Sequence, residues 1–222
     1  MTSRGSELPT GAVPWVHDLA RWIARWLHRP TYRIRVRHAA RVPASGPVVL
    51  VANHSSFIEP QILFGFVPRR AVFLVKAELS RGVAGKAFGW LGQIMVRRGS
   101  ADRASLMAAV GVLRGGGLIG VFPEGTRGSG DVTHAEQGAA WLVRMTDAVV
   151  VPVATRGTFR PPGARRRFRP KLDILVGEPF RLSVQRGRTG LGNATEDIRK
   201  HLADLVRELD ELRSAEDLKK ND

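Results

Sequence analysis

Cysteine is absent from this 222-residue chain, and so is any long run of apolar residues. Without cysteine the protein can form no disulfide, no thiolate nucleophile and no cysteine-ligated metal site. No apolar stretch approaches the roughly 18 residues that suggest a membrane-spanning helix, and the first dozen residues lack the apolar core of a signal peptide. We therefore expect a protein that can lie on a membrane but does not cross it.

Acidic residues are scarce relative to basic ones, with 20 Asp and Glu against 35 Lys and Arg and a formal net charge of +15. Such an excess indicates an anionic partner: lipid headgroups, nucleic acid or a polyphosphate compound.

Several motifs are also missing. There is no Gly-x-Ser-x-Gly elbow of serine hydrolases. The glycines of 82–86 are too close for a P-loop, and the glycines of 190–192 follow no predicted strand, which excludes a dinucleotide fingerprint.

Strand and helix patterns alternate along the chain, with no repeat and no linker that could divide two domains. Buried strands are predicted at 48–52, 71–76, 118–122 and 148–154. Half-exposed strands are predicted at 32–38 and 171–176, and amphipathic helices at 100–114, 136–145 and 195–212. We predict an α/β layered fold with a largely parallel central sheet flanked by helices.

The segment from Pro14 to His28 predicts an N-terminal amphipathic helix. One face carries apolar residues at helical spacing, namely Trp15, Leu19, Trp22, Ile23, Trp26 and Leu27. The other face carries Asp18, Arg21 and Arg25. Tryptophans together with arginines favour a helix that lies in the interface of an anionic membrane. The alternative, a helix that packs its apolar stripe on the domain core, stays open.

The stretch from Pro47 to Pro60 holds the first candidate site. His54 follows a buried strand, and in open α/β sheets ligands bind at the carboxyl ends of the strands. Glu59 comes five residues later, just before a proline suited to a helix start. A carboxylate on one ring nitrogen fixes the tautomer and leaves the other nitrogen free to take a proton from a hydroxyl. Alone, the two residues would more simply be a structural histidine and a helix-start charge.

A second stretch changes that balance. The predicted strand Leu118–Phe122 ends in Pro123-Glu124-Gly125-Thr126-Arg127, a turn that presents an arginine to an anion. Asn53-His54 with an acid five residues on, followed by Phe-Pro-Glu-Gly-Thr-Arg, resembles the glycerolipid acyltransferases, typified by lysophosphatidic acid acyltransferase. The resemblance covers roughly residues 30 to 180.

The resemblance implies transfer of a fatty acyl group from acyl-CoA or acyl carrier protein to the free hydroxyl of a lysophospholipid. The most direct acceptor is 1-acyl-sn-glycerol-3-phosphate, which would give phosphatidic acid. His54 would be the base and Glu59 the acid that orients it. The family pattern also supplies substrate-binding candidates, with Arg127 on the acceptor phosphate: Lys76, Arg98, Glu124, Gly125, Thr126 and Arg127.

The same resemblance implies no permanently bound cofactor and no metal. The acyltransferase domain would occupy residues 30–213, after a disordered start and interfacial helix over 1–29 and before a charged tail over 214–222. The expected location is the cytoplasmic face of the cell membrane, as a peripheral protein on an anionic surface.

Two departures from the family pattern bear on the acceptor. The family usually has aspartate in place of Glu59, and Ala135-Glu136-Gln137-Gly138 stands where relatives often carry Phe-Lys-x-Gly. We expect Glu59→Asp to retain or raise activity. The alternatives are an acyltransferase for another lipid hydroxyl, on a glycolipid or amino-acid lipid, or a non-catalytic basic module that binds nucleic acid or anionic membrane. Because three of the five tryptophans lie in the helix of 14–28 and none in the arginine-rich stretch of 159–171, we expect no nucleic-acid binding.

Overall fold

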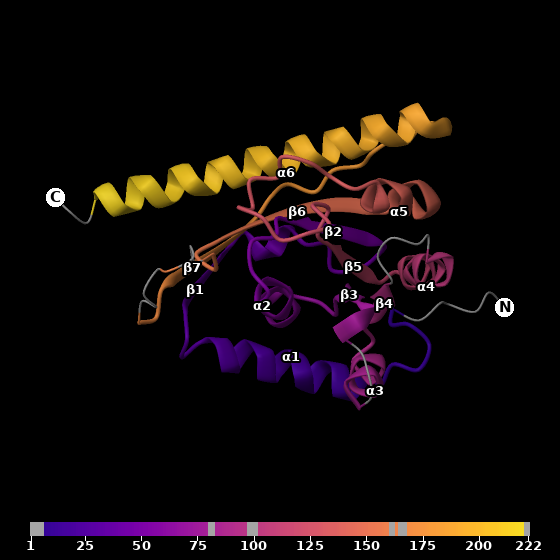
Figure 1. Cartoon of the computed structure of the whole chain (residues 1–222), viewed down its shortest axis with the longest axis horizontal. Coiled ribbons are helices and arrows are strands. Elements are labelled where there is room, and N and C mark those ends of the chain that lie inside the picture. Colours follow the sequence, from indigo (N-terminus) through magenta and orange to yellow (C-terminus); the bar gives the residue numbers. More distant parts are fainter. Residues whose placement is uncertain (1–6, 80–82, 97–101, 160–162, 164–167, 220–222) are drawn as a thin grey trace.

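A seven-stranded sheet crosses the middle of the molecule, within the residues that the computed structural model describes: 7–79, 83–96, 102–159, 163 and 168–219 (Figure 1). The strand order across the sheet is β1-β7-β6-β2-β5-β3-β4. In chain order the strands are β1 (Arg33–Arg37), β2 (Val48–Ala52), β3 (Val72–Lys76), β4 (Ile94–Val96), β5 (Leu118–Val121), β6 (Val149–Arg156) and β7 (Lys171–Val176).

Strand β2 lies at the centre of this sheet, between β6 and β5, and runs parallel to both. All five of its residues are buried, as expected for a strand that is covered on both faces. Among the described pairings of named strands only that of β6 with β7 is antiparallel, and Val150 of β6 also forms an isolated antiparallel bridge with Phe180. The predicted α/β fold with a largely parallel sheet is therefore confirmed.

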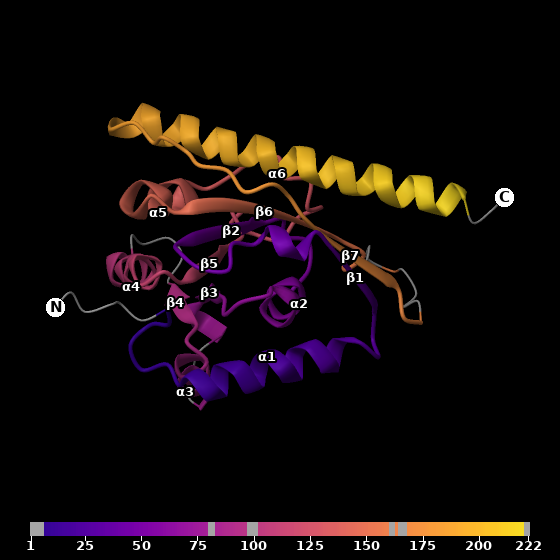
Figure 2. The same ribbon diagram turned by 180° about the vertical axis from the view of Figure 1, so that it is seen from behind.

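Helices cover both faces of the sheet (Figures 1 and 2). Val49 and Val51 of β2 point to the face covered by α4, α5 and α6, whereas Leu50 points to α2 on the other face. Helix α1 lies outside α2. The helices are α1 (Pro14–His28), α2 (Glu59–Phe66), α3 (Val83–Trp90), α4 (Arg103–Arg114), α5 (Gly138–Thr146) and α6 (Gly187–Leu218), with short 3-10 turns at Ala39–Arg41 and Ala77–Leu79.

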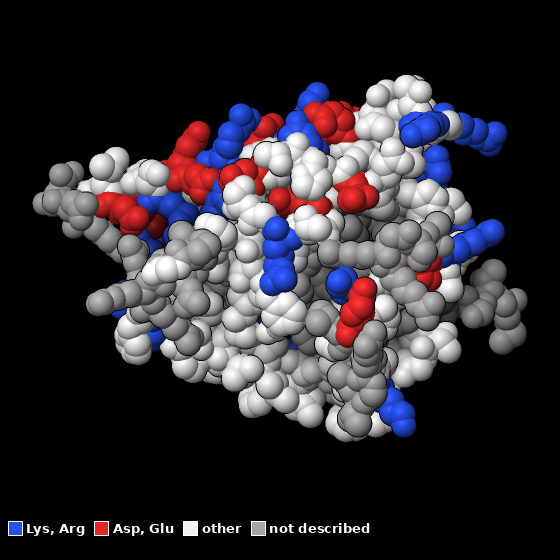
Figure 3. Space-filling model, in the orientation of Figure 1, with Lys and Arg blue, Asp and Glu red and all other residues white. Residues whose placement is uncertain are grey.

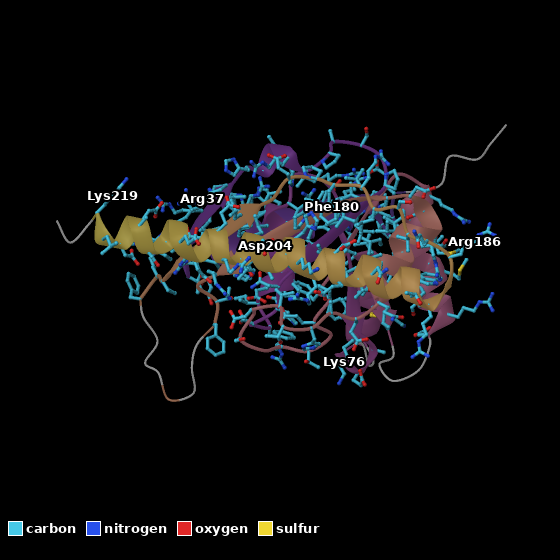
Figure 4. All side chains as sticks on the ribbon, turned by 90° about the horizontal axis from the view of Figure 1, so that it is seen from above. Arg37, Lys76, Phe180, Arg186, Asp204 and Lys219 are labelled. Carbon is cyan, nitrogen blue, oxygen red and sulfur yellow. The ribbon has the colours of Figure 1, made fainter. Side chains whose placement is uncertain are left out.

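The last helix is longer than the sequence predicts. Helix α6 starts at Gly187, and the hydroxyl of Thr195, the first residue of the predicted helix, donates to the carbonyl oxygen of Leu191 within it. Glycines in this first part lower helix propensity and make it look like a loop, but Leu191 packs in the core and holds it helical. The helix continues to Leu218, into the predicted charged tail. Figure 4 shows it lying across the molecule between Arg186 and Lys219.

The N-terminal segment differs from expectation at Leu8, and the orientation of its helix decides between the two alternatives left open by the sequence. Leu8 lies in the stretch expected to be disordered, yet it is buried in the core. Helix α1 turns its polar face, not its apolar face, toward the protein. The guanidinium of Arg21 donates to the carbonyl oxygens of Phe64 (3.2 Å) and Val67 (2.5 Å) at the end of α2. Such bonds satisfy carbonyl groups that a helix end leaves without partners.

The apolar face of α1 is consequently exposed. Its side chains are 47% to 68% exposed, namely Trp15, Leu19, Trp22, Ile23, Trp26 and Leu27. The close approach of α1 and α2 needs Gly65, because a Cβ there would lie 2.8 Å from the backbone nitrogen of Arg25. The alternative that the stripe packs on the domain core is therefore wrong.

Candidate active site

The site begins where β2 ends, at the buried side chain of Asn53. Its amide oxygen accepts the N–H of Thr155 (2.7 Å), and its amide nitrogen donates to the carbonyl oxygens of Thr155 (3.0 Å) and Gly130 (3.2 Å). These bonds tie β2 to β6 and to the loop after Arg127. The next residue, His54, therefore leaves the sheet from a fixed position at its carboxyl edge.

His54 and Glu59 form the predicted pair. Nδ1 of His54 lies 3.0 Å from Oε2 of Glu59, which is the first residue of α2. The Glu59 side chain is fully shielded from solvent, whereas 12% of the His54 side chain is exposed. The turn of residues 55–58 thus folds the carboxylate back onto the ring, and the acid is buried behind the base.

The environment of Glu59 keeps it ionised. Burial raises the pKa of this carboxyl, but hydrogen bonds from His54, Ser55, Thr158 and the N–H of Ser56 outweigh burial and hold the pKa below its ordinary value. An ionised carboxylate is only an acceptor, so the neutral ring of His54 carries its proton on Nδ1. Its Nε2 then has a free lone pair and can act as a base.

The second motif meets the first directly. Strand β5 adjoins β2, and the ring of Phe122 lies 4.4 Å from the ring of His54. Oε1 of Glu124 accepts the backbone N–H of His54 (2.6 Å). The N–H of Gly128 donates to the carbonyl oxygen of His54 (3.0 Å). Burial raises the pKa of Glu124 above its ordinary value. Glu124 therefore holds the backbone of the base and does not contact its ring nitrogens.

The rest of the turn leads outward to Arg127. Gly125 takes a positive φ of 67°, which favours glycine, and Thr126 and Arg127 are exposed. The guanidinium carbon of Arg127 lies 5.9 Å from the ring centre of Phe57, which belongs to the turn between His54 and Glu59. A cation over an aromatic face is attracted to it. The structure thus brings the predicted base and the predicted anion clamp to one edge of the sheet.

The two remaining candidates are Lys76, which lies apart from this cluster, and Arg98. Lys76 ends β3 at the same carboxyl edge, separated from β2 by β5. It is exposed and pairs with Glu78 at 3.6 Å. Arg98 lies outside the described residues, so its role stays a prediction.

Comparison with known proteins matches the part of the chain that contains these motifs. A family model described as Acyltransferase matches residues 33–156, which is more than half of the chain. The chain belongs to the acyltransferase family. The matched range includes all the predicted site residues, and the resemblance inferred from their motifs is confirmed.

Individual acyltransferases give a more detailed comparison. The chain is 26% identical to the 1-acyl-sn-glycerol-3-phosphate acyltransferase of Bacillus subtilis over 191 residues, 81% of this chain and 91% of that protein. It is 34% identical to the human alpha enzyme of the same name over 126 residues, 54% of this chain but only 44% of the human protein. The crystal structure of PlsC, the 1-acyl-sn-glycerophosphate (LPA) acyltransferase of Thermotoga maritima, has the same fold, with a TM-score of 0.63, 23% identity and coverage of 90% of this chain and 79% of that one.

Sequence reasoning missed part of the acyltransferase site. The N–H groups of Ser55 and Ser56 and the hydroxyl of Ser55 donate to Glu59, contacts that the sequence motif did not indicate. Thr158 also donates to Glu59, from a position 99 residues further along the chain. The one signal for Thr158 is its place just after β6, the strand beside β2, and that neighbourhood is visible only once the strand order is known.

Apart from this site, the described residues form a further surface pocket, but no metal site and no membrane-spanning helix. A surface pocket of about 430 Å³ lies at the amino ends of β2 and β6, where Pro47, Val149 and Phe180 line it. Because His54 follows the carboxyl end of β2, this pocket is at the opposite edge of the sheet, and Figure 4 shows Phe180 and Lys76 on different sides of α6. Within the described ranges no three His, Asp or Glu residues could hold a metal ion, and no helix is long and apolar enough to span a bilayer.

Proposed function

We propose that this acyltransferase esterifies the free hydroxyl of 1-acyl-sn-glycerol-3-phosphate with a fatty acyl group, giving phosphatidic acid. The observation that carries the proposal is the His54–Glu59 pair at 3.0 Å, with no hydrogen bond to Nε2 of His54 from the residues that the structure describes, and with Arg127 on the adjoining turn. A base without a protein nucleophile suits a substrate that brings its own hydroxyl. A cation beside that base suits an acceptor with a phosphate.

The chemistry needs one proton to move twice. Nε2 of His54 takes the proton of the acceptor hydroxyl while the oxygen attacks the thioester carbonyl carbon. The tetrahedral intermediate collapses with cleavage of the carbon–sulfur bond, and the imidazolium returns the proton to the leaving thiolate. Glu59 stays ionised and stabilises the imidazolium. The N–H groups of Ser55 and Ser56 already donate to Glu59, so the oxyanion must take its hydrogen bonds from other groups.

The acyl donor is a thioester of coenzyme A or of acyl carrier protein. Either carrier supplies an activated carbonyl, so direct transfer requires no acyl-enzyme intermediate. The acceptor phosphate would bind Arg127, whose guanidinium can form two charge-assisted hydrogen bonds, with Lys76 and Arg98 as further contacts. Gly125 and Thr126 shape the turn, and Glu124 fixes it to the backbone of His54.

We place the protein on the anionic, cytoplasmic face of the membrane, with α1 as the surface that enters the lipid interface. The apolar side chains of α1 are 47% to 68% exposed, and the guanidinium carbon of Arg29 lies 4.6 Å from the ring centre of Trp26. In Figure 3 charged residues gather along the upper edge, over α6, whereas the lower edge, along α1, shows mainly uncharged ones. Tryptophan-rich amphipathic faces of this kind bind at the headgroup boundary.

The rival reading, a basic module that binds nucleic acid, loses much of its support. Two of the three outward arginines of β1 are engaged, because Arg35 and Arg37 both pair with Glu216 of α6. Lys171 at the start of β7 pairs with Asp217 (2.6 Å). Helix α6 therefore supplies the counter-charges of the basic strand face.

The test is product formation. Purified protein on vesicles of phosphatidylglycerol and phosphatidylcholine would be incubated with acyl-CoA or acyl carrier protein thioester and a panel of lysolipids, and products identified by mass. We expect phosphatidic acid from lysophosphatidic acid at the highest rate. Faster acylation of a lysolipid without a terminal phosphate would point to another acceptor, and acylation of no lysolipid would overturn the proposal.

A further inference from the structure

Glu59 is held by two hydroxyl groups that come from different parts of the chain. Oε1 of Glu59 accepts the hydroxyl of Ser55 (2.6 Å) and the hydroxyl of Thr158 (2.5 Å), and the two hydroxyl oxygens lie 3.3 Å apart. Ser55 belongs to the same turn as His54. Thr158 follows β6 and lies beyond residues 33–156, the range that matches the acyltransferase family model.

The two carboxylate oxygens have separate partners. Oε2 accepts Nδ1–H of His54 and the N–H groups of Ser55 and Ser56, whereas Oε1 accepts only the two hydroxyls among the described contacts. A carboxylate can rotate about the bond to its side chain, and rotation would turn Oε2 away from the ring. The hydroxyls on Oε1 oppose that rotation.

We propose that Thr158 is a positioning residue for acyl transfer, which holds the plane of the Glu59 carboxylate so that Oε2 faces Nδ1 of His54. The proposal rests on the proposed function for its kinetic consequence, but its geometric consequence concerns the ring of His54 alone. Thr158 acts through Glu59 and touches neither substrate nor ring.

The chain fixes Thr158 firmly in place. Gly157 has a φ of 102°, and a Cβ there would lie 1.9 Å from the carbonyl oxygen of Lys171, so only glycine allows this exit from β6. Just before it, Arg156 is bound to Asp210 of α6 (2.8 Å), and Thr155 is bound to Asn53. Thr158 itself is only 8% exposed. A hydroxyl on such a rigid support can orient a catalytic group closely.

The test compares Thr158→Val, which keeps the shape but removes the donor, with Thr158→Ser, which keeps the donor. Thr195→Val is the matched control, because Thr195 is also 8% exposed and also donates one hydroxyl bond, within α6. We expect Thr158→Val to lower kcat about tenfold to hundredfold and to change the acceptor KM less than about threefold. Thr158→Ser should restore most of kcat, and Thr195→Val should leave it unchanged.

A second readout does not depend on activity. In ¹⁵N-labelled protein the side-chain nitrogens of the six histidines report their tautomers, and the signals of His54 are those that His54→Gln removes. We expect wild type, Thr158→Ser and Thr195→Val to hold the proton of His54 on Nδ1, and Thr158→Val to show a mixture of tautomers. Thr158→Ala serves in place of Thr158→Val if the added methyl group prevents folding.

The outcomes separate this proposal from the proposed function. If wild type acylates no lysolipid, the function fails, yet the ¹⁵N signals still test the positioning of the carboxylate. If Thr158→Val folds, keeps the wild-type tautomer and keeps the wild-type kcat, the positioning role is refuted. An equal loss in Thr158→Ser would also refute it, because the hydroxyl would then not be the active feature.

Discussion

The carboxylate of Glu59 lies 3.0 Å from Nδ1 of His54 and is fully shielded from solvent, while the ring keeps an exposed edge. Burial of an ionised carboxylate is costly unless hydrogen bonds replace its water. Within the described part of the chain, these bonds come from the turn after His54, from the ring itself and from Thr158. The acid is therefore a fixed support for the base and does not reach the substrate.

Shortening the acid should lower activity. From the sequence we expected Glu59→Asp to retain or raise it, because the family usually has aspartate there. The geometry favours the opposite outcome, since an aspartate on the same backbone would draw the carboxylate away from Thr158 and from Nδ1 of His54. We expect kcat to fall about tenfold or more. Combined with Thr158→Val, the losses should be less than multiplicative, because both changes remove one shared contact. Fully multiplicative losses would show that Glu59 and Thr158 act independently.

The ionised state of Glu59 gives a pH dependence of stability. Its pKa is depressed in the folded state, so its contribution is present at neutral pH and is lost as the pH falls through the folded pKa, below the ordinary range of a glutamate carboxyl. Glu59→Gln should lower the unfolding free energy at neutral pH by about 2–4 kcal/mol. Urea unfolding at several pH values would show the gap between variant and wild type closing in acid. A gap that stayed constant would mean that Glu59 is not ionised in the folded protein.

Removal of the exposed guanidinium should act on the acceptor. Arg127→Ala should lower kcat/KM for lysophosphatidic acid about tenfold to hundredfold, mainly through KM, because the charge-assisted contact with the phosphate is lost. With monoacylglycerol, which has no phosphate, the same variant should match wild type. Arg207→Ala, an exposed arginine of α6, is the control. An equal loss with both acceptors would exclude a phosphate contact.

Much of this site follows from local sequence. A buried strand followed by His54 and then Glu59 predicts the base and its acid, and the turn through Arg127 predicts a second element at the same sheet edge. Both motifs carry their signal within a few residues. The layered α/β fold was predictable for the same reason, because each element has its own pattern of apolar residues.

The rest depends on contacts between distant residues. Nothing near Thr158 in the sequence shows that it reaches Glu59, since that contact exists only because β6 lies beside β2. Which face of α1 is turned to the protein also could not be predicted from the local sequence pattern. The apolar stripe was evident, but only the bonds of Arg21 to the end of α2 show that the stripe faces outward. Helix α6 begins among glycines that packing on the core makes helical.

The outward face of α1 predicts membrane binding through tryptophan. Trp22 and Trp26 are 60% and 50% exposed, and the double variant Trp22→Glu, Trp26→Glu should keep the wild-type melting temperature. Its binding to phosphatidylglycerol vesicles should fall about tenfold or more, because two aromatic side chains no longer enter the lipid. Sedimentation with vesicles measures this. Met107→Glu, at an exposed apolar position on α4, is the control, and equal loss in both would show that added negative charge alone weakens binding.

The most direct measurement is acyl transfer by His54→Gln, with lysophosphatidic acid and a labelled acyl thioester, beside His201→Gln. The ring of His201 stacks on Phe180 at 4.1 Å, away from the carboxyl edge of the sheet. We predict that His54→Gln loses activity about 10³-fold or more while it keeps its melting temperature, and that His201→Gln keeps its activity. A folded His54→Gln protein that still formed phosphatidic acid at the wild-type rate would contradict His54 as the base.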